Sequence, residues 1–415
     1  MNTGLNVESN AGLNVESNVG LNTGLNVESN TGLNIGIFTD TYHPHVNGVV
    51  TSIRMLKMEL AKLGHQVFIF TTSDPNTAKE SNVFRLPSMP ITFLPPHRVA
   101  VFYSPKLLLR VKSLRLDIIH THTEFPLGMF GKVVSEFYRI PIVHTYHTMY
   151  EDYTHHILKG YLITPKMAQH FSRVFCNRAK VVIAPADKTR NYLKEIGVVR
   201  PIKTIPTGID FAPFAQENFT KDELAYTKSE LGIGPDDPVV ISIGRVAKEK
   251  SLDVLIDMMP KLLAKLPDAK LLIVGDGPAL PKLKKMAQGQ NIEGSVIFAG
   301  EQPWDTIAKY YHLGDVFATA STSETQGLTY IEAMASMVPV VVKRDPSFER
   351  LIVHKRTGFI FEKNSDAADV IYYALTHKDE AKEAAKRGFE VVRVLSAGQY
   401  AVDLEGVYRS LRGDL

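Results

Sequence analysis

Short apolar runs alternate with longer amphipathic segments from about residue 34 onward. The short runs are of strand length and rich in Ile, Val and Phe, whereas the longer segments space their apolar residues at helical intervals. The runs predict strands at 35–39, 66–72, 117–120, 140–145, 180–184, 202–205, 238–243, 270–274, 295–298, 316–319 and 338–342. Strands that alternate with helices in this way are typical of parallel sheets, so the pattern predicts an α/β fold.

The alternation runs through the chain twice. A length of 415 residues is too great for one ordinary hydrophobic core and suits two domains. The two runs meet near Pro206–Phe214, which we interpret as a linker. We therefore expect two Rossmann-like domains, residues 34–205 and 206–395, whose parallel sheets face each other across a cleft. A final helix over residues 396–415 either completes the second domain or packs on the first.

The first 33 residues are a repeat of different character. GLNVESN occurs at 4–10, 12–18 and 24–30, and GLNIGIF at 32–38 leads into the first predicted strand. The repeats are rich in Asn, Ser and Gly and contain no aromatic residue, so they bury too little apolar surface to offset the entropy of ordering. We expect residues 1–33 to form a disordered extension that contributes no core side chain.

The net charge of +3 is unevenly distributed. Residues 34–203 contain 22 Lys and Arg against 11 Asp and Glu, a balance of +11. Residues 204–415 contain 25 basic and 30 acidic residues, a balance of −5. The basic half indicates an anionic partner, which could be a membrane surface, a nucleic acid or a small molecule, or it is only a solvated basic face.

One segment of the basic half combines apolar and basic positions. Residues 105–116 have Leu and Val on one face of a predicted helix and a set of cations elsewhere: Lys106, Arg110, Lys112 and Arg115. The pattern indicates a helix that lies at a membrane interface, or an ordinary surface helix with snorkelling cations.

Cysteine content and hydropathy limit the compartment. Cys176 is the only cysteine, so neither an intramolecular disulfide nor a cysteine metal cluster can form. No uncharged run approaches the ~20 apolar residues of a spanning helix, and the start lacks a basic segment followed by an apolar core. We therefore expect a cytoplasmic protein.

Two turns that follow predicted strands contain groups that suit phosphate. After the first strand, Gly48 opens a helix whose free N–H groups attract a phosphate or carboxylate. After the first strand of the second half come Gly244, Arg245 and, five residues further on, Lys250. An Arg and a Lys are the usual partners of phosphate oxygens, so the pair could hold one diphosphate. The alternative is an exposed charged loop.

A third turn, over residues 321–335, is the most distinctive. Gly327, Leu328 and Thr329 would present N–H groups to an anion at a helix start. Glu324 precedes that start and Glu332 follows it, and carboxylates accept hydrogen bonds well from vicinal sugar hydroxyls. These glutamates could instead be ordinary helix-start and solvent-facing charges, or a hydrolase acid and nucleophile. We disfavour the hydrolase because the neighbouring cations should keep both carboxylates ionised.

Closely spaced histidines follow two strands of the first half. His120 and His122 end one strand, and His147 follows another, three residues ahead of Tyr150. Such pairs could bind a metal ion, but no further ligand pattern accompanies them. We expect His120, His122 and Tyr150 to line the side of the cleft where a substrate that accepts a sugar (the acceptor) would bind, as neutral hydrogen-bonding groups.

Taken together, these motifs resemble the family-4 retaining glycosyltransferases of the GT-B fold. The resemblance rests on the two glutamates eight residues apart, the stretch at 244–250, PTGID at 206–210, GDGP at 275–278 and the opening GIFTDTYHP at 36–44. More narrowly, HTHTEFPLG at 120–128, HTYHTMYEDYTHH at 144–156 and DPSFE at 345–349 resemble the bacterial 1,2-diacylglycerol 3-glucosyltransferases. The chain departs from the family where many members have Pro-Phe, Gly and Gly-Gly, namely at Thr325-Gln326, Met337 and Asp345-Pro346.

The resemblance implies roles for the candidate residues. Arg245 and Lys250 would hold the donor's diphosphate, Glu324 the donor sugar and Glu332 the ribose, with His147 beside the donor sugar. The implied reaction is retaining transfer of glucose from UDP-glucose to the 3-hydroxyl of 1,2-diacylglycerol. The enzyme would be attached peripherally to an anionic membrane surface on its cytoplasmic side, with no tightly bound cofactor, no metal site and no nucleic-acid partner. Stimulation by Mg²⁺ is left open.

Three alternatives stay open at this point. The enzyme could use another lipid or polyol acceptor, or another sugar donor. A UDP-sugar epimerase could be built on the same double-Rossmann scaffold, and a sugar-nucleotide-binding regulatory protein would need no catalysis. Release of UDP that depends on diacylglycerol distinguishes the first reading from these alternatives.

Overall fold

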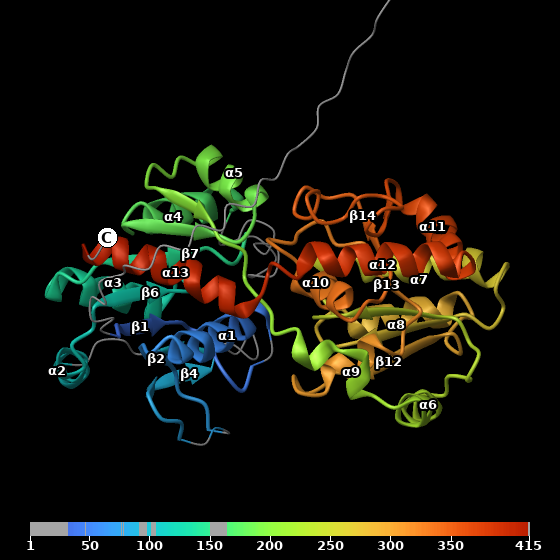
Figure 1. Cartoon of the computed structure of the whole chain (residues 1–415), viewed down its shortest axis with the longest axis horizontal. Coiled ribbons are helices and arrows are strands. Elements are labelled where there is room, and N and C mark those ends of the chain that lie inside the picture. The colour runs from blue at the N-terminus through green and yellow to red at the C-terminus, as the bar shows by residue number, and fades with distance from the viewer. Residues whose placement is uncertain are drawn as a thin grey trace, which may run out of the picture.

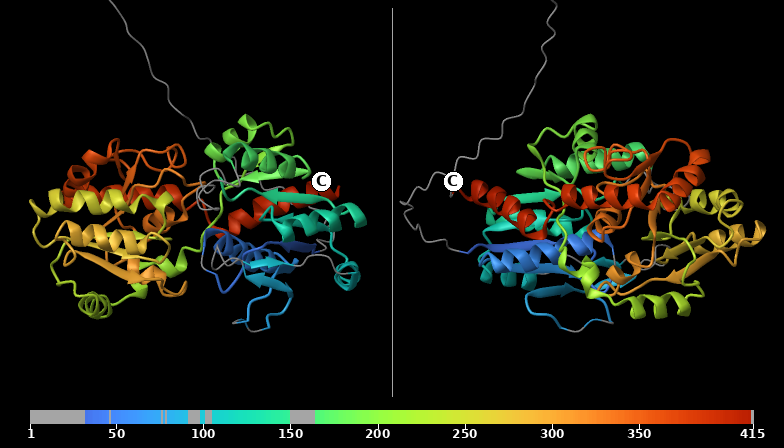
Figure 2. Two further views of the ribbon diagram at one scale, coloured as in Figure 1. Left: turned by 180° about the vertical axis from the view of Figure 1, so that it is seen from behind. Right: turned by 45° about the vertical axis from the view of Figure 1, so that its right-hand side comes forward.

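The computed structural model describes residues 32–45, 47–75, 77, 79–90, 98–100, 105–149 and 164–413. These residues form two α/β units that lie side by side (Figure 1), and the views in Figure 2 show the same division. Each unit has its own parallel sheet and its own helices. This arrangement confirms the predicted α/β fold with two Rossmann-like domains.

The first unit contains a seven-stranded parallel sheet in the order β3-β2-β1-β6-β7-β8-β9. Its strands are β1 (Asn34–Phe38), β2 (Gln66–Thr72), β3 (Val83–Leu86), β6 (Ile118–Thr121), β7 (Ile142–Thr145), β8 (Val181–Ala184) and β9 (Ile202–Thr204). A short antiparallel pair, β4 (Ser88–Pro90) and β5 (Arg98–Ala100), stands beside it. Six of these seven sheet strands match the predicted runs; β3 and the antiparallel pair were not predicted.

Helices cover both faces of the first sheet. They are α1 (Gly48–Lys62), α2 (Pro105–Ser113), α3 (Pro126–Tyr138), α4 (Pro165–Cys176) and α5 (Asp187–Glu195). Ile35 and Ile37 of β1 pack into a core with α1 on one face, whereas Phe38 packs into a second core with α2 and α3 on the other. The two faces of the sheet are therefore buried by different helices.

The second unit contains a six-stranded parallel sheet in the order β12-β11-β10-β13-β14-β15. Its strands are β10 (Val239–Ile243), β11 (Lys270–Val274), β12 (Val296–Gly300), β13 (Val316–Thr319), β14 (Val340–Lys343) and β15 (Phe359–Phe361). Its helices are α6 (Lys221–Glu230), α7 (Leu252–Leu263), α8 (Leu280–Gly289), α9 (Ile307–Tyr311), α10 (Leu328–Ala335), α11 (Ala367–Thr376) and α12 (Lys378–Val392). Of the six strands, β15 was not predicted.

The chain passes between the units twice. Ile209, on the first passage, donates its N–H to the carbonyl of Leu395 on the second at 3.0 Å, and its own carbonyl accepts from Ala397 at 2.9 Å. The last helix, α13 (Ala397–Arg412), then lies against α1 (Figure 1). Tyr400 and Tyr408 of α13 are buried in the core of the first unit, so the last helix packs on the first domain.

Leu33 corrects the expected start of the folded chain. Its side chain is fully buried in the core that contains Ile35, its N–H donates to Nδ1 of His65 at 2.9 Å, and its carbonyl accepts from Gln66 at 2.8 Å. The expectation that residues 1–33 contribute no core side chain was therefore wrong at its last residue. Residues 1–31 lie outside the described part of the chain.

Candidate active site

The start of α10 gathers groups from both units. Gly327 is the N-cap of α10, with φ of 77°, and it makes no side-chain cap, so the first N–H groups of the helix have no side-chain partner there. A Cβ built on Gly244 would lie 3.8 Å from Cγ2 of Thr329, and one built on Gly48 would lie 3.6 Å from Cδ1 of Leu328. The glycines that open α1 and follow β10 thus both lie beside this helix start.

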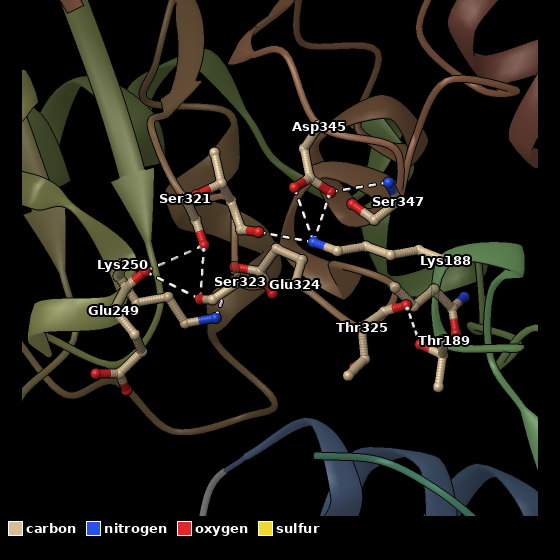
Figure 3. Close-up of polar contacts among 12 residues, drawn as sticks. Lys188, Thr189, Glu249, Lys250, Ser321, Ser323, Glu324, Thr325, Asp345 and Ser347 are labelled. Carbon is tan, nitrogen blue, oxygen red and sulfur yellow. Dashed lines mark hydrogen bonds and ion pairs between the residues drawn. The ribbon is translucent and has the colours of Figure 1, made fainter. Parts of the chain in front are cut away.

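Lys250 is paired with a carboxylate in this structure. It lies in a short 3-10 helix (Lys248–Lys250) after β10, and its Nζ is 2.7 Å from Oε1 of Glu324. Ser323 of the same loop donates to the carbonyl of Glu249 at 3.0 Å, which ties the loop to the 3-10 helix (Figure 3). Arg245, two residues into the turn after β10, has an exposed side chain. Lys250 is therefore held against Glu324 in the turn that also contains Arg245.

The two glutamates have opposite electrostatic surroundings. Burial would raise the pKa of Glu324, but the charge and hydrogen bond of Lys250 outweigh burial, and the pKa lies below its ordinary value. Burial raises the pKa of Glu332 to about 7, although the Tyr311 hydroxyl donates to its Oε2 at 2.7 Å and lowers it. The expectation that both carboxylates stay firmly ionised was therefore wrong for Glu332, because Lys250 lies against Glu324 alone of the two in the described ion pairs.

His120 has a structural role and does not face an acceptor, which corrects its assignment to the acceptor side. Its side chain is fully buried, and its two ring nitrogens lie 2.7 Å from the hydroxyls of Tyr408 and Thr145. Burial and the neighbouring histidines hold its pKa well below the ordinary value, so the ring is neutral as expected. It ties α13 to β6 and β7.

His122 and His147 form a hydrogen-bonded pair beside the second unit. Nδ1 of His122 lies 2.8 Å from Nε2 of His147, and the two rings are stacked with their centroids 5.1 Å apart. Burial lowers the pKa of His147 to about 3 and that of His122 well below its ordinary value, so both rings are neutral near pH 7. The carbonyl of His147 accepts from Oγ1 of Thr325 at 3.0 Å, which joins this pair to the loop of Glu324.

Lys188 is a site residue that the sequence interpretation missed. It lies in α5, and its Nζ contacts the carboxylate of Asp345 at 2.8 and 3.0 Å and the carbonyl of Thr322 at 2.7 Å (Figure 3). Asp345 is one of the residues at which the sequence departs from the family pattern, and Lys188 is its ion-pair partner. Because these residues follow β8, β13 and β14, the carboxyl edges of the two sheets meet here.

A second polar contact involves Gln326, another residue at which the sequence departs from the family pattern. The side-chain amide of Gln326 donates to the carbonyl of Thr207 at 2.9 Å, and its Oε1 accepts from the N–H of Thr207 at 2.8 Å. Gln326 is buried, and Thr207 belongs to the first passage between the units. This pair fixes the residue before Gly327 against the linker.

The proposed membrane residues lie far from α10. Figure 1 places α2 at the end of the first unit that is remote from the second unit. Arg110, Lys112 and Arg115 are exposed, and the helix ends at Ser113 rather than continuing to residue 116, with Arg115 at φ 48°. The side chain of Lys106 and all of Tyr150 lie outside the described residues.

Membrane-spanning helices and metal-ion clusters are both absent from the residues that the structure describes. No helix among them is long and apolar enough to cross a membrane. They also contain no group of three or more His, Cys, Asp or Glu arranged to hold a metal ion. Of the histidines after β6 and β7, His120 contacts two hydroxyls, His122 contacts His147, and His144 contacts Glu124.

Family models and solved structures agree with this architecture. The model described as Glycosyltransferase Family 4 matches residues 46–212, and Glycosyl transferases group 1 matches residues 226–391. HepE (Alr3699) of Anabaena superposes with a TM-score of 0.75 at 17% identity, covering 91% of this chain and all of that one. Sucrose-phosphate synthase of Thermosynechococcus elongatus gives 0.76 at 22% identity over 92% of this chain and all of that one. The fold is that of the GT-B glycosyltransferases, and both family models describe glycosyltransferases.

Sequence relatives narrow the class. Alpha-monoglucosyldiacylglycerol synthase of Streptococcus pneumoniae is 41% identical over 84% of this chain and 80% of its own length. The enzyme of the same name from Acholeplasma laidlawii is 31% identical over 91% of this chain and 97% of its own. The chain belongs to the glycosyltransferase family that contains these synthases. This membership, rather than the charge of Glu332, decides against the hydrolase.

Proposed function

We propose that the protein transfers glucose from UDP-glucose to the 3-hydroxyl of 1,2-diacylglycerol with retention of configuration. The observation that carries this proposal is the identity of 41% to a monoglucosyldiacylglycerol synthase across both units. The solved structures of HepE contain UDP and glucose, but at 17% identity they support the fold alone. The donor and the acceptor are therefore inferred from the sequence relatives and tested below.

The donor's diphosphate binds at the start of α10. Arg245, Lys250 and the N–H groups of residues 327–329 supply positive charge there, and Gly48 and Gly244 leave room because neither carries a Cβ. As the bond to glucose breaks, negative charge grows on the leaving UDP, and these groups stabilise it. Glu332 then accepts from the ribose hydroxyls.

Glu324 orients the glucose. Lys250 holds its carboxylate in the ionised form, which leaves oxygens that accept hydrogen bonds from sugar hydroxyls. His147 acts beside the sugar as a neutral hydrogen-bonding group, because a ring whose pKa is about 3 is a poor proton acceptor near pH 7.

The acceptor oxygen attacks on the face from which UDP leaves. The bond between C1 of glucose and the phosphate oxygen breaks, the bond from C1 to the acceptor oxygen forms, and the acceptor proton passes to the leaving phosphate. UDP-glucose and the acceptor are the only reactants in this route, and the protein groups stabilise charge without forming a covalent bond. Retention follows because the new bond forms on the same face as the old one.

The membrane contact is part of the proposal. Each Lys or Arg near an anionic surface contributes about 1 kcal/mol, so the exposed cations of α2 suffice for reversible docking at the cytoplasmic face. Neutralising Lys106, Arg110, Lys112 and Arg115 together should weaken binding to anionic vesicles and leave UDP affinity unchanged. Equal binding by this variant would remove α2 from the membrane contact.

A matrix of donors and acceptors tests the reaction. UDP release is measured with UDP-glucose, UDP-galactose and GDP-mannose, each with diacylglycerol, another lipid or a polyol. The proposal requires that release depend on UDP-glucose and diacylglycerol together. Preference for another acceptor or donor would change the substrate, acceptor-independent conversion of UDP-glucose would indicate an epimerase, and binding without turnover would indicate a regulatory protein.

A further inference from the structure

Helix α3 has an apolar stripe on its outer side. Phe125, Met129, Val133 and Phe137 recur every fourth residue, so they share one face of the helix, and all four are exposed. Phe137 is 69% exposed, more than any other Phe among the exposed large apolar residues. The opposite face of α3 packs into the core through Leu127, Phe130 and Val134, and these apolar residues therefore stabilise the first unit. The stripe has no such explanation.

Helix α4 extends the stripe. Met167 and Phe171 are exposed one turn apart, and the ring of Phe171 stacks on that of Phe125 with centroids 6.4 Å apart. The two helices are in close contact, since a Cβ built on Gly128 would lie 3.2 Å from Phe175. We call this surface the α3–α4 apolar ridge; it consists of Phe125, Met129, Val133, Phe137, Met167 and Phe171.

The ridge is continuous with α2. The Tyr138 hydroxyl at the end of α3 donates to the carbonyl of Leu108 at 2.9 Å, and the next residue of α2, Leu109, is 67% exposed. The ridge and α2 belong to the face of the sheet whose core contains Phe38, whereas α1 and α13 cover the other face. One side of the first unit therefore combines exposed apolar residues from three helices.

Charge identifies the kind of partner. Exposed cations border the ridge: Lys166 and Arg173 on α4, Arg139 at the end of α3, and Arg110 and Lys112 on α2. The one acid on the outer side of α3, Glu136, lies 3.2 Å from Nζ of Lys132. Exposed apolar side chains with exposed cations on the same helices match a bilayer that presents anionic headgroups around a hydrocarbon interior.

The ridge begins at the site. Phe125 precedes α3, three residues after His122, because α3 starts at the carboxyl edge of the sheet where the site residues gather. From there α3 runs for 13 residues, about 20 Å at 1.5 Å per residue. We infer that the α3–α4 apolar ridge inserts into the headgroup region of an anionic bilayer and holds the carboxyl edge of the first sheet against the surface from which the acceptor comes. This inference rests on the proposed function only for the identity of the acceptor.

The test replaces three ridge residues that lie away from the site. The variant contains Met129→Gln, Val133→Gln and Phe137→Gln, which keep helix propensity and remove exposed apolar surface. The control contains Met58→Gln on α1 and Val402→Gln on α13. These two residues are 46% and 47% exposed, matching the 45% and 44% of Met129 and Val133, but they lie on the opposite face of the sheet. Circular dichroism and thermal unfolding establish that both variants are folded.

Binding is measured by co-sedimentation with vesicles of equal parts phosphatidylcholine and phosphatidylglycerol. The ridge variant should bind about tenfold more weakly than wild type, and the control should bind like wild type. The loss should persist at high salt, because apolar insertion is not screened, whereas the contribution of α2 cations is. Binding of the ridge variant equal to that of wild type and the control overturns the inference.

Two further measurements separate other outcomes. If wild type sediments as a dimer that the ridge substitutions dissociate, and vesicle binding is unchanged, the ridge is a contact between copies and the inference is wrong. Glucose transfer to dispersed short-chain diacylglycerol should be the same in wild type and the ridge variant, while transfer in vesicles falls with binding. Absence of transfer in every protein together with weaker vesicle binding by the ridge variant would overturn the proposed function but support the ridge.

Discussion

Glu324 and Glu332 lie at the same helix start and differ in charge. Lys250 lies 2.7 Å from Glu324 and keeps it ionised, whereas Glu332 contacts the neutral hydroxyl of Tyr311 and titrates at about 7. A carboxylate that is protonated for part of the time in the free enzyme must lose its proton before it accepts two hydroxyls. Donor affinity should therefore depend on pH through Glu332 and not through Glu324.

Donor binding should weaken as pH falls through 7. The pKa of Glu332 is raised, so the ionised form predominates only above about 7, and each pH unit below it should cost up to tenfold in affinity. UDP-glucose is the ligand of choice, since a terminal phosphate such as that of UDP itself titrates at about 6. Titration calorimetry from pH 5.5 to about 8.5 measures the slope.

Two variants control this pH dependence. Glu332→Gln should bind weakly with no slope in this range. Tyr311→Phe should move the midpoint to higher pH, because the Tyr311 hydrogen bond lowers the pKa of Glu332. A slope that survives in Glu332→Gln would assign the titration to another group.

The two cations near the diphosphate make a second prediction. Arg245→Ala and Lys250→Ala should each remove a charge-assisted contact and weaken UDP binding by about 1.5–3 kcal/mol. Lys248→Ala is the matched control, since Lys248 is an exposed cation of the same turn. Isothermal titration with UDP compares the three. Equal loss in Lys248→Ala would mean that the turn acts only through its overall charge.

For single residues of the site, the sequence predicts which residue types are present better than which residues contact each other. The glycines and N–H groups beside α10 were predicted because a helix start and a missing side chain act locally. The pairing of Lys250 with Glu324 and the burial of His120 against Tyr408 depend on residues 74 and 288 positions apart. The spacing of residues along the chain does not predict contacts between positions so far apart.

Helix α5 connects the two units through Lys188. The Asp345 carboxylate is 4% exposed and the Lys188 side chain 17%, so the ion pair is largely withdrawn from water. Lys188→Met would leave Asp345 buried with only the Ser347 N–H as a remaining described donor, and should destabilise the protein by about 2 kcal/mol. Denaturant unfolding measures the loss.

A neighbouring ion pair provides the control for Lys188. Arg350 is 84% exposed and lies 2.7 Å from Asp187 across the same junction. Exposed pairs contribute little, so Arg350→Met should change stability by less than about 0.5 kcal/mol. If the two substitutions have equal effects, burial does not govern this contact.

Strands in the middle of both sheets could be predicted, whereas the missed strands β3 and β15 lie at sheet edges. The edge strands β9 and β12 were nevertheless predicted, β9 although it too has only three residues. A central parallel strand is buried on both faces and appears as a continuous apolar run, as in Val239–Ile243. The pair β4 and β5 has only three residues in each strand, and β15 also has three, too few to establish a period. The placement of α13 on the first unit depends on the second passage between the units, which has no local signature.

The beginning of the folded molecule is set by Leu33. A protein that begins at Gly32 should be as stable as the full chain, because residues 1–31 have few side chains that could form a core. One that begins at Asn34 loses a fully buried leucine and should be less stable by about 2–5 kcal/mol, as should Leu33→Ala. Thermal unfolding of the three proteins checks the difference. Loss of stability in the Gly32 protein would show that the repeats contribute to the fold.

Under the proposed function, the molecule as a whole combines a helix start that binds the donor's diphosphate in one unit with a basic, apolar side on the other. The carboxyl edges of the two sheets meet between them through Lys188, Thr325 and Gln326. This arrangement accounts for a water-soluble donor and a lipid acceptor that reach one place from opposite units. The central claim of the proposed function is retaining glucosyl transfer to diacylglycerol.

The configuration of the product tests that claim most directly. The enzyme is incubated with UDP-glucose and dioctanoylglycerol, and the purified product is examined by proton NMR for the anomeric coupling and the position of the new linkage. The account predicts an α-glucoside on the 3-oxygen, since UDP-glucose is itself the α-anomer. A β-glucoside, or no glucosyldiacylglycerol from a folded enzyme that binds UDP, would contradict it.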